Sequence, residues 1–202
     1  MSNQFNTDTR LAQQLSFILE IDKAKYVLRQ TYLTGKGRRE NDAEHSWHLA
    51  VMAYLLAEYS NEPIDVAKAM LMCLVHDIVE IQAGDTFAFD EEGKKSQAER
   101  EERAKQQLFS LLPDDQAQAL MKLFDEFVAN ETAEAHFVHA MDNLQPLLLN
   151  DSNDGISWVE HGVTVDQMYA RHNKTKLGSE QLFELTDALI KKHAQLGHLI
   201  EK

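Results

Sequence analysis

Three ionisable residues, His76, Asp77 and Glu80, interrupt an apolar run from Ala69 to Ile81. An imidazole and two carboxylates so close together can bind a divalent metal ion or transfer protons. The spacing predicts a helix from about residue 65 to 81 that is apolar on nearly all sides, which is typical of a buried helix. Buried charges are costly unless they are paired or bind a metal. Other segments are therefore expected to supply partners.

Two more ionisable residues lie at expected core positions of other helices. His45 begins the apolar stripe of a helix over 41–59, and Asp142 lies on the stripe of a helix over 131–149. A lone inward histidine is more often a hydrogen-bonded core residue than a ligand, and a lone inward aspartate is often a cap or ion-paired. Periodicity alone does not distinguish His45 from His48.

Long amphipathic segments, few glycines and no useful strand alternation predict an all-α fold. Asn41, with Glu44 three residues later, predicts the start of the helix that carries His45. Pro146 predicts that its helix is bent or interrupted there. The expected helices cover residues 11–19, 26–33, 41–59, 65–81, 96–112, 114–127, 131–149, 165–171 and 179–194, with loops at 82–93 and 150–155.

The chain of 202 residues contains no repeats, low-complexity tracts or linker. We expect one domain over 1–202, with a core at about 11–149 and C-terminal helices over 160–198 packed on it. The net charge of −13 argues against nucleic-acid or anionic membrane partners, but a small phosphorylated substrate needs only a few local cations.

The single cysteine, Cys73, lies in the buried run, which excludes a disulfide framework and favours a reducing compartment. No apolar run approaches the roughly 20 residues that span a bilayer, and the N-terminus lacks the pattern of a signal peptide. These features predict a cytoplasmic protein.

The order His45, then His76-Asp77, then Asp142 resembles the HD-domain superfamily of metal-dependent phosphohydrolases. The His-Asp dipeptide alone is a weak signal, whereas all four positions together are specific. The resemblance implies a compact helical bundle around a buried central helix that carries the His-Asp pair. It also selects His45 over His48.

A closer resemblance lies in RRENDAEHS (38–46), HDIVE (76–80) and Gly84-Asp85. These segments resemble the branch that contains the bacterial 5′-deoxynucleotidases and HD-domain-containing protein 2. The resemblance covers about residues 11–149 and implies a homodimer. It implies a phosphomonoesterase that acts on nucleoside 5′-monophosphates. Nucleoside triphosphate or alarmone hydrolysis, or a non-catalytic domain that binds a nucleotide or metal, are the alternatives.

The resemblance implies one divalent ion held by His45, His76, Asp77 and Asp142. Two imidazoles and two carboxylates suit Mn²⁺, Co²⁺, Fe²⁺, Ni²⁺ or Zn²⁺, with Mg²⁺ less natural. Four protein ligands on an octahedral ion leave two positions for a phosphate oxygen and a water.

Catalytic roles are implied for Glu80 and Asp85, which would orient the attacking water and handle protons on the leaving alkoxide. Which residue does which stays open. The alternative for Glu80 is a partner that orients a ligating histidine, and the alternative for Asp85 is a loop or cap carboxylate; the surrounding motif favours the catalytic role for both.

The resemblance implies substrate contacts for Arg29, Arg38 and Thr86. The two arginines suit this role because a guanidinium can donate two hydrogen bonds to phosphate oxygens. Gln30 follows Arg29 where the deoxynucleotidases carry tryptophan, so the resemblance does not extend to their preference for 2′-deoxy sugars.

His139 stands where many relatives have lysine, and it is a substitute contact, a packed histidine or without a role. A later group of residues either closes over a nucleoside base or, more commonly for such residues, covers the core or makes a dimer contact. This group is Trp158, His161, Arg171, His172 and Asn173.

Overall fold

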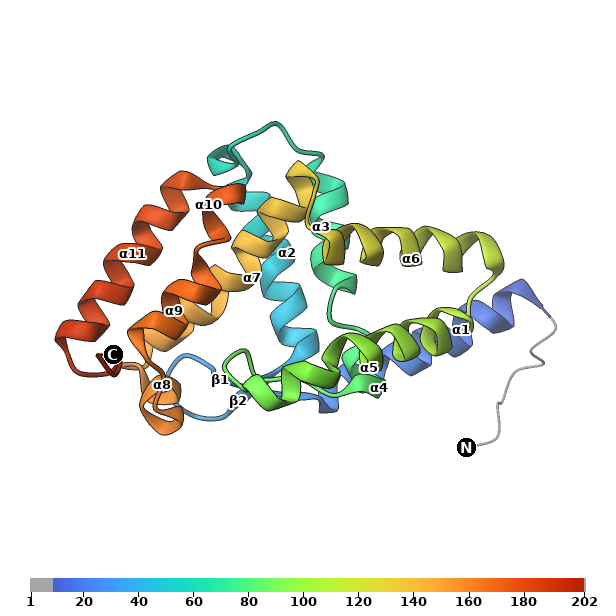
Figure 1. Ribbon diagram of the computed structural model, residues 1–202. Helices are drawn as coiled ribbons and strands as arrows, with labels where there is room; N and C mark the ends of the chain where they lie inside the picture. Colours follow the sequence, from blue (N-terminus) through green and yellow to red (C-terminus); the bar gives the residue numbers. More distant parts are fainter. Residues whose placement is uncertain (1–8, 202) are drawn as a thin grey trace.

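The computed structural model describes residues 9–201 and is mainly helical, which confirms the expected all-α class (Figure 1). No helix in this range is long and apolar enough to cross a membrane. The helices are α1 (Arg10–Ile21), α2 (Asp42–Leu56), α3 (Val66–Val75), α4 (Glu80–Ala83), α5 (Glu91–Phe109), α6 (Asp114–Ala129), α7 (Ala133–Ser152), α8 (Ile156–His161), α9 (Val165–His172), α10 (Thr175–Gly178) and α11 (Glu180–Gln195), with 3-10 turns η1 (Asp22–Tyr26) and η2 (Ala57–Tyr59).

Helix α7 organises the fold, because α2, α3, α6, α10 and α11 all pack against it. Leu49, Met72, Phe137 and Met141 are fully buried where α2, α3 and α7 meet. The helix passes through Pro146 and ends at Ser152, beyond its expected end at 149. Figure 1 shows α1, α5 and α6 extending to one side of this centre and α8, α9 and α11 to the other.

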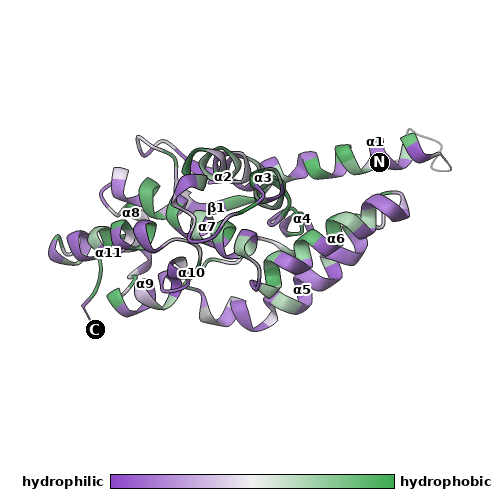
Figure 2. Ribbon diagram, turned by 90° about the horizontal axis from the view of Figure 1, so that it is seen from above, coloured by the Kyte–Doolittle hydropathy of each residue, from purple (hydrophilic) through white to green (hydrophobic). Residues whose placement is uncertain are grey.

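Figure 2, viewed from above, shows the same division: α1, α5 and α6 lie on one side of the molecule and α8, α9 and α11 on the other. Helix α5 begins at Glu91, five residues earlier than the expected 96, so the loop before it is shorter than predicted. Among the C-terminal helices, α10 and α11 make the most extensive contacts with α7.

The start of α2 confirms the predicted cap. The Asn41 side chain accepts from the Glu44 amide at 3.0 Å, and the Glu44 carboxylate accepts from the Asn41 amide at 3.1 Å. This reciprocal pair satisfies two amides at the start of the helix. It fixes the first turn of α2, from which Asp42 and His45 project.

The helix expected over 26–33 is wrong. Strand β1 (Leu28–Tyr32) occupies most of this segment and pairs antiparallel with β2 (Arg39–Asn41). The turn between them contains Gly35 at φ 87° and Lys36 at φ 60°, and this left-handed backbone closes a hairpin rather than extending a helix. The hairpin points Arg29 toward the centre of the fold.

The central helix also ends earlier than predicted. Helix α3 stops at Val75 with His76 as its C-cap, residues 77–79 form a turn, and α4 resumes at Glu80. The His76 Nδ1–H donates to the Cys73 carbonyl at 2.8 Å. Because the chain leaves the helix at Val75, the side chains of His76 and Asp77 are directed to the same side and approach each other.

Candidate metal centre and active site

Three elements bring the four expected ligand residues together. Ligand atoms of His45 (α2), His76 (after α3) and Asp142 (α7) lie within 4.8 Å of one another. Asp142 Oδ1 lies 3.2 Å from His45 Nε2 and 3.9 Å from His76 Nε2. Asp77 Oδ2 lies 3.1 Å from His76 Nε2 and 3.7 Å from His45 Nε2. Two imidazole nitrogens and two carboxylates therefore converge.

The Nε2 atom of His76 indicates that this cluster fits a metal ion. Because His76 donates its Nδ1–H to the Cys73 carbonyl, its neutral ring presents a lone pair at Nε2. That nitrogen is buried and lacks a hydrogen-bond partner. A buried lone pair that faces two carboxylates and a second imidazole fits a divalent cation, and the bond to Cys73 orients the ring as in ligating histidines.

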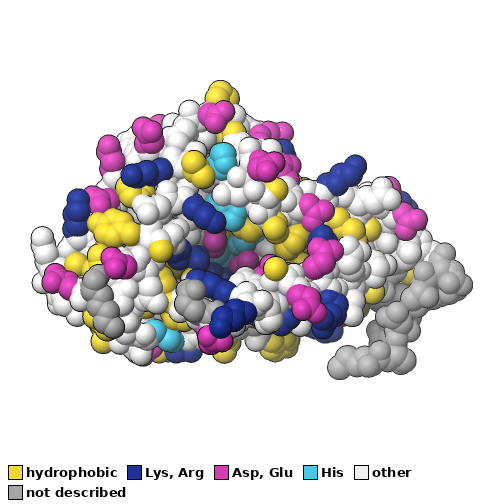
Figure 3. All heavy atoms as spheres, viewed as in Figure 1, with side chains coloured by type: hydrophobic (Ala, Val, Ile, Leu, Met, Phe, Trp, Pro, Cys, Tyr) yellow, Lys and Arg dark blue, Asp and Glu magenta, His cyan; other side chains and the backbone are white. Residues whose placement is uncertain are grey.

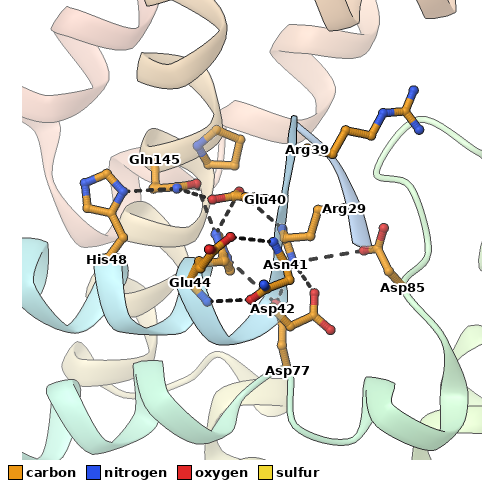
Figure 4. A network of polar contacts seen from close by, with 12 residues as sticks. Arg29, Arg39, Glu40, Asn41, Asp42, Glu44, His48, Asp77, Asp85 and Gln145 are labelled. Carbon is orange, nitrogen blue, oxygen red and sulfur yellow. Dashed lines mark hydrogen bonds and ion pairs between the residues drawn. The ribbon is translucent and has the colours of Figure 1, made fainter. Parts of the chain in front are cut away.

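Gln145 holds the His45 ring in its orientation, and Figure 4 shows Gln145 between Glu40 and His48. Gln145 Oε1 lies 3.0 Å from His45 Nδ1, and its Nε2 donates to Glu40 at 2.9 Å and contacts His48 Nδ1 at 3.2 Å. His48 therefore lies in the outer network, and His45 alone reaches the cluster. Burial lowers the pKa of His45, but hydrogen bonds to Asp142 and Glu40 outweigh this and raise it to about 9.

Arg29 joins the carboxylates of this region. Its guanidinium lies 2.7 Å from Asp77, 3.6 Å from Asp42 and 4.0 Å from Asp85 (Figure 4). Burial lowers the pKa of Arg29, but the surrounding carboxylates outweigh it and raise the pKa overall. Arg29 thus acts as a buried counter-ion to several acids.

Asp42 is a site residue that the sequence did not reveal. It is 1% exposed, and neither of its carboxylate oxygens has a hydrogen-bond partner. Its oxygens group with those of Asp77 and Glu80 within 4.8 Å. Burial, and then the charge of Asp77, raise the pKa of Asp42 to about 7.

Glu80 and Asp85, the two expected catalytic acids, both line the same cavity. Glu80 is 6% exposed and its Oε2 has no partner. Burial and the neighbouring carboxylates raise its pKa well above the usual range. Burial also raises the pKa of Asp85. Carboxyls with raised pKa values in a cleft are suited to proton transfer near neutral pH.

A cavity of about 590 Å³ opens beside the cluster. Figure 3 shows it as a hollow in which histidine and acidic side chains are visible, with Lys and Arg side chains around it. Its volume lies in the range of small-molecule sites. Its charged lining residues are Arg29, Asp77, Glu80, Asp85, Lys94, Glu101, Asp142, Arg171 and Lys174.

Arg38, expected at the substrate, lies elsewhere. Its side chain is 56% exposed, does not line the cavity and donates to Glu44 at 2.8 Å. The cap at the start of α2 draws it to the surface. Thr86 does line the cavity, where its hydroxyl accepts from Arg100 at 2.7 Å.

The residues whose roles the sequence left open differ in whether they line the cavity. His139 stacks on Phe127 of α6 at 4.1 Å and donates to the Phe127 carbonyl at 2.9 Å, and it also lines the cavity. Trp158, His172 and Arg171 line the cavity, and Arg171 lies 3.5 Å from Asp142 Oδ2. The two remaining members of the group, His161 and Asn173, are not lining residues.

The model of the HD domain family matches residues 21–183, which is most of the chain. The chain belongs to the HD domain family. Human 5′-deoxynucleotidase HDDC2 is 30% identical over 135 residues, or 66% of this chain and 65% of that protein. The Bos taurus HDDC2 is 30% identical over 66% of this chain and 64% of its own length. This HD-domain chain thus spans slightly less than two thirds of these curated relatives.

Solved structures resemble the chain over nearly its whole length. The crystal structure of a predicted metal-dependent phosphohydrolase from Magnetospirillum magnetotacticum has a TM-score of 0.91 and 48% identity, and covers 96% of this chain and 98% of its own. A conserved hypothetical protein from Pyrococcus furiosus has a TM-score of 0.52 and 25% identity, over 90% of this chain and 94% of its own.

Proposed function

We propose that this HD-domain protein is a metal-dependent phosphohydrolase that releases phosphate from nucleoside 5′-monophosphates. The observation that carries the proposal is the buried, unpartnered Nε2 of His76, which faces His45, Asp77 and Asp142 at the wall of the cavity. The similarity to 5′-deoxynucleotidase HDDC2 supports the choice of substrate class.

In this proposal His45, His76, Asp77 and Asp142 hold one divalent ion, for which Mn²⁺, Co²⁺, Fe²⁺, Ni²⁺ and Zn²⁺ suit the nitrogen and oxygen donors better than Mg²⁺. An ion bound there supplies a Lewis acid for the phosphoryl group and lowers the pKa of water.

The chain's own residues then position and transfer protons. Glu80 and Asp85, both at the cavity wall, orient the attacking water and protonate the leaving oxygen between them. Arg29 holds Asp77 in place through its 2.7 Å contact and offsets the repulsion among the acids. Thr86 follows Asp85 on the same loop and offers a hydroxyl to the substrate.

We also propose that the protein is a homodimer. One face of α2 carries the exposed apolar residues Trp47, Val51, Tyr54 and Leu55, of which Trp47 is 64% and Tyr54 65% exposed. Contiguous exposed apolar surface of this kind marks association sites, and a second copy is the expected partner.

The function is tested by phosphate release after metal exchange. Chelator-stripped protein is reloaded with Mn²⁺, Co²⁺, Zn²⁺ or Mg²⁺ and offered ribo- and 2′-deoxynucleoside 5′-monophosphates and a nucleoside triphosphate. Release from 5′-monophosphates only after reloading is the expected result. Absence of release with every metal, or release from the triphosphate alone, contradicts the proposal.

A further inference from the structure

The arginine expected to bind phosphate is already occupied. Arg29 is 12% exposed and lies within 4.0 Å of four carboxylates, the closest being Asp77 at 2.7 Å and the others Glu40, Asp42 and Asp85. An arginine that offsets four acids provides little positive potential for another anion. A phosphate dianion in this cavity therefore requires other cations.

Two cations enter the cavity from α9 and the turn before α10. Arg171 lies in the last turn of α9, and its guanidinium is 3.5 Å from Asp142 Oδ2. Lys174 is exposed and lines the cavity, and its side-chain ammonium has neither a hydrogen bond nor an ion pair within residues 9–201. Both line the cavity together with Asp142, and the Lys174 ammonium is available to an incoming anion.

We propose that Arg171 and Lys174 form the binding site for a phosphate dianion, the phosphoryl group of the substrate, beside the metal centre. Arg171 faces one carboxylate, that of Asp142, whereas Arg29 faces four, and the Lys174 ammonium has no ion pair within residues 9–201. The guanidinium and the ammonium together therefore keep positive charge for the two negative charges of a phosphomonoester. Arginine adds a planar fork for two phosphate oxygens. The identity of the ligand as a monoester rests on the proposed function, whereas the anion site itself rests on the two cations.

Packing fixes this pair relative to the metal centre. Thr175, directly after Lys174, is fully buried, and its hydroxyl accepts from Asn143 of α7 at 3.5 Å. A Cβ on Gly178 would lie 2.3 Å from the His136 carbonyl, so only glycine allows α10 to approach α7 this closely. Because α7 also carries Asp142, the cations and the metal ligand share one rigid support, which reduces the ordering cost of binding.

The charge match also determines the substrate class. A phosphodiester carries one negative charge and leaves one cation unmatched, whereas a monoester neutralises both. The site therefore selects terminal phosphoryl groups over internal phosphodiester linkages, and its affinity for phosphate falls as salt screens the exposed Lys174.

The test is calorimetric titration of metal-loaded protein with inorganic phosphate. Arg171→Ala and Lys174→Ala are each expected to weaken the Kd for phosphate about ten- to a hundredfold, because each removes a charge-assisted hydrogen bond. Arg171→Lys should recover part of the loss. The matched control is Lys176→Ala, because this lysine of α10, two residues after Lys174, lies over the Phe183 ring at 4.3 Å and does not line the cavity. Its Kd should equal that of the wild type.

An unchanged Kd in the Arg171→Ala, Lys174→Ala double variant overturns the inference, as does a wild-type protein that does not bind phosphate. Metal content is measured for each variant, because Arg171 contacts a proposed ligand. Lys174→Glu provides a second test at an exposed position that folding does not require. Phosphate binding that depends on both residues, without turnover of any monophosphate, refutes the proposed function alone. Turnover with an unchanged KM in the double variant refutes the inference alone.

Discussion

Gln145 offers a direct test of how the metal centre is held. It is fully buried, and Gln145→Leu removes its contacts with His45, Glu40 and His48 while preserving most of the side-chain volume. The change leaves the His45 Nδ1–H and a Glu40 oxygen buried without partners. Each orphaned group costs about 1–3 kcal/mol, so the free energy of unfolding should fall by about 2–6 kcal/mol.

The same substitution frees the His45 ring to rotate and to change tautomer. Removing the partner that orients a ligating histidine weakens metal affinity by about 10–100-fold. Urea unfolding measures the stability change, and competition with a chelator measures the metal Kd under conditions in which circular dichroism shows each protein to be folded.

The matched control is Gln116→Leu. Gln116 accepts from Gln14 at 2.8 Å between α1 and α6, away from the cluster. This variant should lose some stability and keep the wild-type metal Kd. If Gln145→Leu binds metal as tightly as Gln116→Leu, Gln145 does not orient a ligand and the reasoning is refuted.

Three further predictions concern other parts of the site. Asp77→Ala should lose metal and phosphate release together, whereas Glu80→Ala should keep metal and lose rate; metal loss from Glu80→Ala would contradict its role. Arg100→Ala, which frees the Thr86 hydroxyl, should lower kcat without changing metal content, and an unchanged kcat would contradict a positioning role. Burial, followed by the charge of Arg171, lowers the pKa of His172 to about 3. Below about pH 6.5 His172 is therefore protonated in the unfolded chain but not in the folded protein, and the free energy of unfolding decreases as the pH is lowered. His172→Gln should remove about 3 kcal/mol of the loss between pH 7 and 4, measured by urea unfolding; equal losses in both proteins would contradict the burial argument.

Helix starts could be predicted where their signals are local, whereas the four residues of the candidate metal centre were chosen by the resemblance. Asn41 and Glu44 predict the start of α2 through side chains three residues apart, and the structure contains that cap. The resemblance selected His45 over His48, and the structure places only His45 at the cluster. Periodicity could not make this choice, because both residues lie on the inward side of one helix.

The parts that could not be predicted depend on contacts between distant segments. Strand β1 is short, and the two residues on its inward face, Arg29 and Thr31, are polar, so hydrophobic alternation could not reveal it. Asp42 reads as an acid that favours the first turn of a helix, although its spacing three residues before His45 places both on one face. Gln145 lies three residues after Asp142 on the same inward side of α7. A polar residue at such a core position is the sequence feature that indicates a partner for a ligand residue.

Arg38 shows the opposite error, because its position in the motif suggested the substrate. The helix cap formed by Glu44 provides a carboxylate at the surface, and Arg38 pairs with it outside the cavity. Arg171 and Lys174, which do line the cavity, come from C-terminal segments beyond the region of resemblance at residues 11–149. The distance along the chain hid their relation to Asp142.

The central claim is that one divalent ion, held by His45, His76, Asp77 and Asp142, is required for phosphate release. The direct test is titration of metal-stripped protein with Mn²⁺ or Co²⁺, with bound metal and the rate of phosphate release from a nucleoside 5′-monophosphate measured in the same samples. The rate should rise in proportion to bound metal and level off at one ion per chain, and Asp142→Ala should remove both. Full activity in the stripped protein, or bound metal without any release, would contradict the account.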